Sequence, residues 1–333
     1  MNIQKAISCS FSDKQRILSA ILLFLLFICI DAFADTTTTN TTGKVLIGAY
    51  INGIHSIDLK AGTVDLDLYI WLRTKGERNL LESFEVLNGS ISDKSSIVKK
   101  KIGDENYYSM RITVKAFQNY DLRKFPLDNQ KLVLFIEDSE EDITALQFSP
   151  DKENTKAGNS VSLPGWAIGK TSITVTTNSY NTNYGDISLG QQNSNYSRAT
   201  IEIPISREGI GYFLKMFGTV FLAASVAFLS FFIRPDDLDP RFGLGVGGIF
   251  AVVASNFVLS SMLPETYQVT MGEALLLITI ISIFVALLES VVSLKLWEDD
   301  KKVAALKLDS MAGWVVPISY LLICFFVITM YLY

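Results

Sequence analysis

Along residues 44–207, apolar and polar residues alternate in several short stretches. The clearest stretch is 64–73, where aliphatic side chains fall on one face and charged or aromatic side chains fall on the other. A period of two is typical of a β-strand that buries one face of a sheet. The same period marks residues 107–116, 132–136 and 201–205, and turn-rich stretches separate these strands. The pattern predicts an immunoglobulin-like β-sandwich.

Beyond residue 210 the alternation ends and long apolar runs begin. Four runs, each about long enough to cross a bilayer as a helix, cover about residues 212–233, 242–263, 274–296 and 314–333. Lysine or arginine occurs in the connections after the first and third runs, and the connection after the second run has neither. Because positively charged loops remain in the cytoplasm, we expect the sandwich and the C-terminus on the other side of the membrane.

The first 34 residues carry the three parts of a secretory leader. Basic residues precede an apolar run over 17–30, and Ala32-Phe33-Ala34 forms a small-x-small cleavage site. An uncleaved membrane anchor is the alternative. The expected organisation is a signal peptide (1–34), an extracellular or periplasmic all-β sandwich (35–208) and an α-helical transmembrane domain of four spans (209–333).

Composition excludes several classes of function. Hydrophobic residues make up 49% of the chain, and the mean hydropathy of +0.30 is high for a soluble protein. The formal charge of -5 and the lack of a long basic run argue against nucleic acid as a partner. The cysteines are Cys9, Cys29 and Cys324, so no disulfide can hold the sandwich. Because the chain has one histidine and no catalytic set, we expect no enzymatic activity.

One segment is specific enough to indicate a family. Residues 121–130 read Asp-Leu-Arg-Lys-Phe-Pro-Leu-Asp-Asn-Gln, which resembles the Phe-Pro-x-Asp-x-Gln hairpin of the loop that gives the Cys-loop receptors their name. Bacterial members lack the two cysteines of that loop, and Gln118 and Leu132 stand at about those positions here. Further matches follow in the family's order: residues 68–72, Arg207, Leu263-Pro264 and 286–289. The chain thus resembles pentameric ligand-gated ion channels, in particular their bacterial members.

This resemblance implies a homopentamer in a cell membrane, here a bacterial inner membrane. The sandwich would bind a small-molecule agonist, and the second helix would line an ion pore. The implied partners are therefore the lipid bilayer, inorganic ions and an unidentified agonist. We expect agonist, protons or Ca²⁺ to act on the sandwich and to tilt the second helices. A non-conducting, membrane-anchored binding domain is the alternative from another class, and four spans argue against it.

The second apolar run carries glycines near one end and serines with an asparagine near the other, which suits a helix that packs closely or borders water. Phe250 and Phe257 lie two turns apart and would form apolar rings that stop ions by dewetting. The alternative is a packing face in which Gly243-x-x-x-Gly247 lets helices approach. One helical face, at steps of three or four residues, is expected to line the pore: Asp239, Gly243, Gly247, Phe250, Ala254, Phe257 and Ser261.

Acidic residues at the inner mouth bear on ion selectivity. Asp236, Asp237 and Asp239 would concentrate cations there, and Asp239 lies closest to the start of the helix. Against this, Pro240-Arg241-x-Gly243-Leu244-Gly245 resembles a segment of anion-selective animal subunits. We expect a cation-selective channel, with an anion-selective channel of the same family as the alternative.

Aromatic and acidic residues mark the agonist site that the resemblance implies between subunits. Aromatic rings hold ammonium groups through cation–π contacts, although surface strand residues are the alternative for the tyrosines. The expected ligand-binding residues are Trp71, Tyr180, Tyr184, Tyr196, Glu137 and Asp138. A second hypothesis is Ca²⁺ bound by Glu137, Asp138 and Glu140, or proton uptake by the same run, and a solvated turn is its alternative. No other cofactor is expected.

Agonist binding must reach the pore through a contact between the sandwich and the helices. A ligand opens a channel only by binding the open form more tightly. By resemblance to the family, the coupling residues are Asp58, Phe125, Pro126, Asp128, Arg207, Pro264 and Tyr267.

Overall fold

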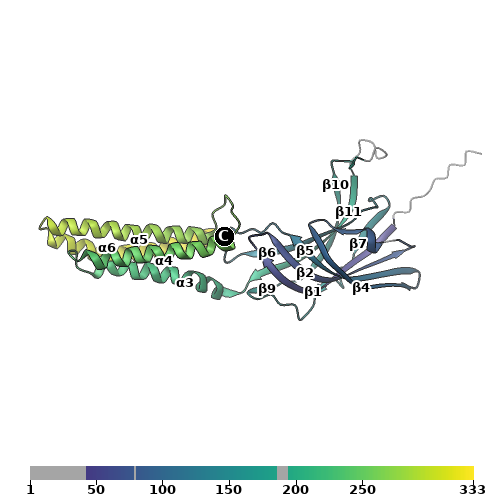
Figure 1. The fold of residues 1–333 in the computed structure, drawn as a ribbon, viewed down its shortest axis with the longest axis horizontal. Helices are drawn as coiled ribbons and strands as arrows, with labels where there is room; N and C mark the ends of the chain where they lie inside the picture. The colour runs from purple at the N-terminus through teal and green to yellow at the C-terminus, as the bar shows by residue number, and fades with distance from the viewer. Residues whose placement is uncertain (1–42, 79, 186–193) are drawn as a thin grey trace, which may run out of the picture. The chain divides into compact units, whose positions relative to one another are not determined.

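The computed structural model describes residues 43–78, 80–185 and 194–333. The predicted leader at 1–34 lies outside the described residues. Within them, two β-sheets are followed by four long helices (Figure 1). The predicted fold class, an all-β sandwich followed by an α-helical four-span bundle, is confirmed.

The first sheet is built on the hairpin of β1 and β2. Its strand order is β4-β5-β2-β1-β7, and β8 also pairs with β1. Neighbours from β4 to β1 are antiparallel, whereas β7 and β8 run parallel to β1. The strands are β1 (Gly43–Asp58), β2 (Thr63–Lys75), β4 (Gly89–Ile102), β5 (Glu105–Phe117), β7 (Leu146–Pro150) and β8 (Lys156–Ala157).

The second sheet has the order β10-β11-β6-β3, with β9 pairing β11. All of these pairs are antiparallel. A short helix, α2 (Leu80–Ser83), leads into β3. The strands are β3 (Phe84–Val86), β6 (Asn129–Asp138), β9 (Trp166–Ile168), β10 (Ser172–Tyr180) and β11 (Ser194–Arg207).

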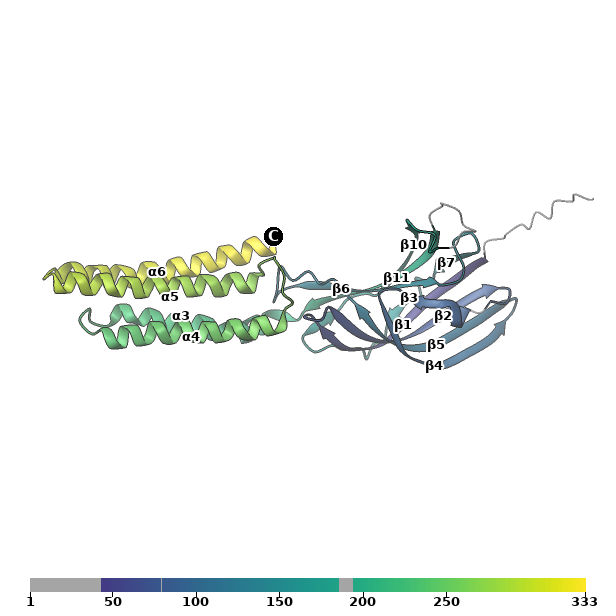
Figure 2. The same cartoon turned by 45° about the horizontal axis from the view of Figure 1, so that its top comes forward.

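Inward-facing residues of both sheets form one apolar core, and Figure 2 shows the sheets as two layers. In β2 the aliphatic residues at positions 64, 66, 68, 70 and 72 are at most 1% exposed, as their alternation predicts. Opposite them lie aliphatic residues of the second sheet such as Leu134 and Ile201. Burying one such side chain contributes about 1.5–3 kcal/mol, so apolar packing holds the two sheets together.

The second face of β2 is less open to water than the alternation predicts. Asp67 is 2% exposed, because Arg111 of β5 donates hydrogen bonds of 2.9 and 2.6 Å to its carboxylate and Asn52 donates one of 2.7 Å. The Arg111 guanidinium holds the pKa of Asp67 below its usual value. A charged pair between neighbouring strands therefore covers part of this face.

The four long helices are each apolar enough to cross a membrane. They are α3 (Gly209–Phe228, continued by the 3-10 turn η2, Leu229–Phe232), α4 (Leu238–Met262), α5 (Met271–Glu298) and α6 (Lys302–Leu332). α6 begins well before the apolar run at 314–333, since the preceding segment is rich in Ala, Leu and Lys, which favour helices. α4 packs against α3 and α5, and α6 lies beside α5 (Figure 2).

Candidate functional site

α4 has two opposite faces. At about 100° per residue, its buried residues fall in a stripe about 60° wide that faces the other helices: Arg241, Gly245, Gly248, Val252 and Leu259. The residues expected to line a pore fall on the other side of the helix, and all of them are exposed in the isolated subunit: Asp239, Gly243, Gly247, Phe250, Ala254, Phe257 and Ser261. The Phe250 and Phe257 side chains are 69% and 77% exposed, so this face carries large apolar groups that do not pack inside the subunit. This face is therefore free to meet water, lipid or other subunits.

The glycines of α4 divide between the same two faces. A Cβ on Gly245 would collide with Leu287 of α5, and a Cβ on Gly248 would press on the Ala223 carbonyl and Ala227 of α3. A Cβ on Gly243 or Gly247 would meet nothing within 4 Å. Close packing inside the subunit thus uses Gly245 and Gly248, and the Gly243-x-x-x-Gly247 pair is not a packing motif within one chain.

Charges at the start of α4 are separated in the same way. Arg241 is fully buried and bound to Asp309 of α6. Arg234 pairs with Asp236 at 2.9 Å and lies over the Trp297 ring. Within the described residues Asp237 and Asp239 form no ion pair, and both are exposed. The uncompensated charge at this end of the helix is therefore negative.

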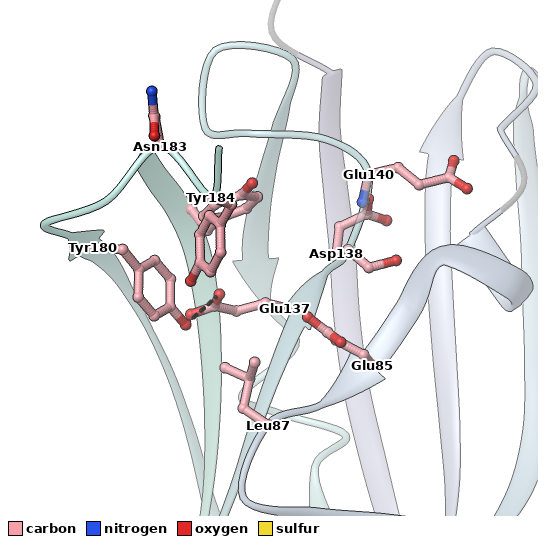
Figure 3. Close-up of a pocket in the computed structure, with 10 residues that line it drawn as sticks. Glu85, Leu87, Glu137, Asp138, Glu140, Tyr180, Asn183 and Tyr184 are labelled. Atoms are coloured by element: carbon pink, nitrogen blue, oxygen red, sulfur yellow. Dashed lines mark hydrogen bonds between the residues drawn. The ribbon is translucent and has the colours of Figure 1, made fainter. Parts of the chain in front are cut away.

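Three tyrosines and four carboxylates line one cavity of about 460 Å³ at the edge of the second sheet (Figure 3). The ring of Tyr180 lies 5.6 Å from that of Tyr184 and 5.9 Å from that of Tyr196. The structure thus brings the three predicted tyrosines together. The acidic lining residues are Glu85, Glu137, Asp138 and Glu140.

Glu137 is the most constrained carboxylate of this cavity, at 2% exposed. Arg198 Nε donates to it at 2.6 Å and the Tyr180 hydroxyl at 3.0 Å, and Arg198 also donates to that hydroxyl at 2.9 Å. Burial and then the adjacent Glu137 raise the pKa of Tyr180. Burial, together with Glu137 and Asp138, raises the pKa of Glu85. The cavity therefore disfavours additional negative charge.

The Ca²⁺ site predicted at Glu137, Asp138 and Glu140 does not fit this geometry. Glu137 is already bound to Arg198. Asp138 accepts hydrogen bonds from the Ser83 hydroxyl at 2.6 Å and from the amides of Glu140 and Glu141, which form a tight turn. Glu140 points away from Glu137 in Figure 3. No group of three or more acidic, His or Cys side chains in the described part of the chain is placed to hold a metal ion.

Trp71 lies on the first sheet and does not line the tyrosine cavity. Its indole Nε1 donates to Asp151 at 3.0 Å, and its ring covers Gly48, its cross-strand partner in β1. Because Gly48 has no side chain, it leaves space for the Trp71 ring. Trp71 therefore has a structural role besides the predicted one in ligand binding.

Arg207 is held in an aromatic cage where the sandwich meets α3. Its guanidinium carbon lies 3.9 Å from the Trp166 ring centre, 4.7 Å from Tyr212 and 5.4 Å from Phe125. Its Nε donates to Asp128, which is 0% exposed, at 3.3 Å. Cation–π contacts of this kind are worth about 0.5–2 kcal/mol each.

This cage opens into a cavity of about 740 Å³ that Asp58 and the α4 residues Ser261 and Met262 also line. The structure thus places three predicted coupling residues, Asp58, Phe125 and Arg207, around one space. The sequence reasoning missed Trp166. Its only sequence signal is a tryptophan in a turn-rich stretch after Pro164-Gly165.

Backbone hydrogen bonds also join the 121–130 hairpin to α5. The amides of Met271 and Gly272 donate to the carbonyls of Arg123 and Phe125 at 2.9 and 3.1 Å. Pro126 is buried next to this contact, and Pro264 lines a smaller cavity of about 290 Å³ with Lys60 and Arg123.

Tyr267 is placed differently from the other predicted coupling residues. It is 93% exposed, and its hydroxyl accepts a hydrogen bond from the neighbouring Gln268. It lines neither of the two cavities at the contact between sandwich and helices. The structure therefore does not bring Tyr267 together with Asp58, Phe125 and Arg207.

Receptor subunits are among the proteins similar to this chain. The gamma-aminobutyric acid receptor subunit beta of Lymnaea stagnalis is 26% identical over 205 residues, which are 60% of this chain and 38% of that subunit. The human gamma-aminobutyric acid receptor subunit rho-2 is 25% identical over 185 residues, 55% of this chain and 37% of the subunit. The human glycine receptor subunit beta is 23% identical over 200 residues, 60% of this chain and 38% of the subunit. The match thus spans less than two fifths of these curated relatives.

No family model matches the chain. The prediction that it is not an enzyme is confirmed by these relatives, which are receptor subunits. The narrower resemblance to bacterial members stays a prediction. With its β-sandwich, its four apolar helices and these relatives, the chain is a multi-pass membrane protein similar to subunits of gamma-aminobutyric acid and glycine receptors.

Proposed function

We propose that this chain is the subunit of a homopentameric ligand-gated ion channel, with the sandwich and the C-terminus outside the cytoplasm of a bacterial inner membrane. One observation carries the proposal: α4 turns a continuous face, with two exposed phenylalanines, directly away from its packing face. In a five-fold assembly that face surrounds the axis. Phe250 and Phe257 then form two apolar rings, which block ions when the rings are narrow enough to expel water.

The charges at the proposed inner end of α4 support the proposal that the channel selects cations. Asp239 is exposed on the proposed pore face, whereas Arg241 is buried and Arg234 is paired. A ring of five such carboxylates raises the local concentration of cations. The second candidate is an anion channel, favoured by the resemblance of residues 240–245 to anion-selective animal subunits.

The agonist we propose is a small organic amine. Three tyrosine rings provide faces for an ammonium group, and the cavity's carboxylates add negative potential. The relatives are receptors named for gamma-aminobutyric acid and glycine, which carry an ammonium group and also a carboxylate, so only the ammonium group supports the amine proposal. Trp71 and Arg111, on the other sheet, would belong to the facing subunit in a site between subunits.

Coupling runs through the Arg207 cage. An agonist that draws the second sheet toward the tyrosine cavity would move β11, which ends at Arg207, and α3, which begins two residues later. The hairpin carbonyls at Arg123 and Phe125 hold the start of α5. The 740 Å³ cavity beside the cage leaves room for these parts to repack.

The test is electrophysiology of purified protein in liposomes, with a panel of amines, at several pH values and with Ca²⁺ added or removed. We expect an oligomer of five subunits and an amine-evoked current that reverses near the cation equilibrium potential in asymmetric salt. Asp239→Asn should shift that potential toward chloride, and Asp300→Asn, an exposed acid in the α5–α6 connection, serves as the matched control. Amine binding without any current would instead support a membrane-anchored binding domain.

A further inference from the structure

One of the largest fully buried side chains of the described structure, that of Arg241, is charged. Arg241 donates to both carboxylate oxygens of Asp309, at 3.3 and 2.5 Å, and to the carbonyl oxygen of Ile233. Two parallel bonds to one carboxylate fix the plane of a guanidinium. α6, which has no residue on the proposed pore face, thus determines where a charge of α4 lies.

A second carboxylate borders this pair. Oε2 of Glu289 on α5 lies 3.9 Å from Nη1 of Arg241. Both Glu289 carboxylate oxygens are buried without a hydrogen-bond partner in the described part of the chain. Glu289 is therefore the group best placed to receive Arg241 when Asp309 is absent.

The position of Arg241 matters because of what lies on the other side of the helix. Asp239 lies about 160° around α4 from Arg241 at 100° per residue, on the exposed face. The start of a helix carries partial positive charge, so an unpaired arginine there would add to it. Charges within about 8–10 Å of a solvated path are incompletely screened at physiological salt, and the bundle interior screens less.

We propose that Asp309 is a positioning residue for ion selectivity: by neutralising Arg241 inside the bundle, it leaves the inner mouth under the control of Asp239. This inference rests on the proposed channel function and deepens it. It assigns part of the selectivity to a residue on a helix that does not line the pore.

The test compares two variants that differ by a single charge. Asp309→Asn with Glu289→Gln removes both carboxylates and leaves Arg241 unpaired. The triple variant adds Arg241→Gln and so removes the unpaired charge as well. Reversal potentials are measured in asymmetric salt, and the oligomer is quantified by size-exclusion chromatography with light scattering.

We expect the double variant to lower the cation-to-anion permeability ratio about threefold. The reason is the Coulomb repulsion between the unpaired Arg241 charge and permeating cations, which salt and protein screen only in part. The triple variant should return the ratio toward the wild-type value because it removes the unpaired positive charge, and the exposed control Asp300→Asn should keep that value. Asp309→Asn alone should give a smaller shift because Glu289 remains. A purely structural role would reduce the amount of oligomer without moving the reversal potential.

Equal permeability ratios in wild type, double and triple variants would overturn the inference while leaving the channel proposal intact. If the double variant does not assemble, Asp309→Asn decides, and an unchanged ratio there overturns the inference. Absence of any wild-type current would instead contradict the channel function itself. The two failures are thus distinguishable.

Discussion

Two arginines, the half-buried Arg207 and the fully buried Arg241, lie at opposite ends of the helical bundle and are stabilised in different ways. Arg207 has one carboxylate, Asp128, and three aromatic rings, and a cavity of about 740 Å³ lies beside it. Arg241 has a bidentate carboxylate and a second one nearby. A guanidinium can shift over an aromatic ring and keep its cation–π contact, whereas two parallel hydrogen bonds to a carboxylate hold it in one orientation. Arg207 thus suits a contact that rearranges, and Arg241 suits a fixed anchor.

Arg198 stands between these two extremes. It pairs with Glu137 at 2.6 Å, and its guanidinium carbon lies 5.0 and 6.0 Å from the Phe135 and Tyr180 ring centres. It contacts Glu137 and Tyr180 of the tyrosine cavity, where the proposed cationic agonist would compete with it for the same groups. Arg198 thus combines the ion pair seen at Arg241 with the aromatic contacts seen at Arg207.

The largest effect is expected at Arg241. Arg241→Gln leaves Asp309 and Glu289 buried without a cation, which costs about 3–5 kcal/mol for a broken buried pair. We expect a strongly lowered unfolding temperature in detergent and loss of the oligomer. Arg234→Gln, an exposed arginine of the same end, is the control. An unfolding temperature equal to wild type would mean that the Arg241 cluster is not an anchor.

Arg207 should affect gating more than stability. Arg207→Ala removes the cage contacts, and we expect the half-activating agonist concentration to rise about tenfold, within the usual range of coupling energies. Arg207→Lys keeps the charge but loses planar stacking, so it should rescue only partly. Trp166→Ala should resemble Arg207→Ala if the cage transmits the signal. Normal activation curves with normal surface delivery would contradict this role.

At the tyrosine cavity, the contributions of the aromatic ring and of the hydroxyl to agonist binding can be measured separately at Tyr180. Tyr180→Ala removes a ring face and should raise the half-activating amine concentration about fivefold, in line with one cation–π contact. Tyr180→Phe keeps the face and loses the hydrogen bond to Glu137, so its effect should be smaller. Equal losses in both variants would assign the role to the hydroxyl network and not to the ring.

The smallest expected effect is on pH dependence. Because burial and two neighbouring acids raise the pKa of Glu85, Glu85 gains a proton as pH falls through the raised value. The cavity then loses negative charge, so we expect amine affinity to fall about twofold, as for one solvent-screened charge. Glu85→Gln should remove this part of the pH dependence, so that the variant has the lower, acid-state amine affinity at every pH.

The same shift has a consequence for stability. The folded sandwich binds the Glu85 proton more tightly than the unfolded chain does, so ionised Glu85 is destabilising near neutral pH. This cost disappears as pH falls through the raised pKa. Glu85→Gln should therefore raise the unfolding temperature slightly at neutral pH and leave it unchanged in acid. An unfolding temperature that drops at neutral pH would contradict the sign of the shift.

Local patterns in the chain were enough for part of the fold, namely the four long helices and the strands β2, β5, β6 and β11. The alternation at 64–73 predicts β2 and its buried face, and the apolar runs predict four helices, because strand and helix periods are local properties. The start of α6 was missed, since a charged helical extension has no apolar signature. The alternation predicted a more solvent-exposed polar face of β2 than the structure has. Arg111 covers Asp67, and it comes from a strand 44 positions away in sequence.

In the candidate site, too, local patterns were predictable from sequence and partners distant in sequence were not. Steps of three and four residues separate the two faces of α4 without reference to other elements. By contrast, Asp309 binds Arg241 across 68 positions, and Trp166 reaches Arg207 from a loop, so neither partner can be identified from one sequence. The Ca²⁺ prediction failed for a related reason: adjacency of Glu137, Asp138 and Glu140 in sequence did not reveal their separate partners.

The most direct test of the account is the accessibility of single cysteines on α4 in an otherwise cysteine-free protein, in which Cys9, Cys29 and the buried Cys324 are replaced by alanine. Ala254→Cys lies on the exposed face and Val252→Cys on the packing face. If the exposed face lines a pore, a charged, water-soluble thiol reagent will modify Ala254→Cys during agonist application and reduce the current, and will leave Val252→Cys unchanged. An Ala254→Cys protein that conducts and reacts only with a membrane-soluble reagent would show that this face meets lipid, and would contradict the account.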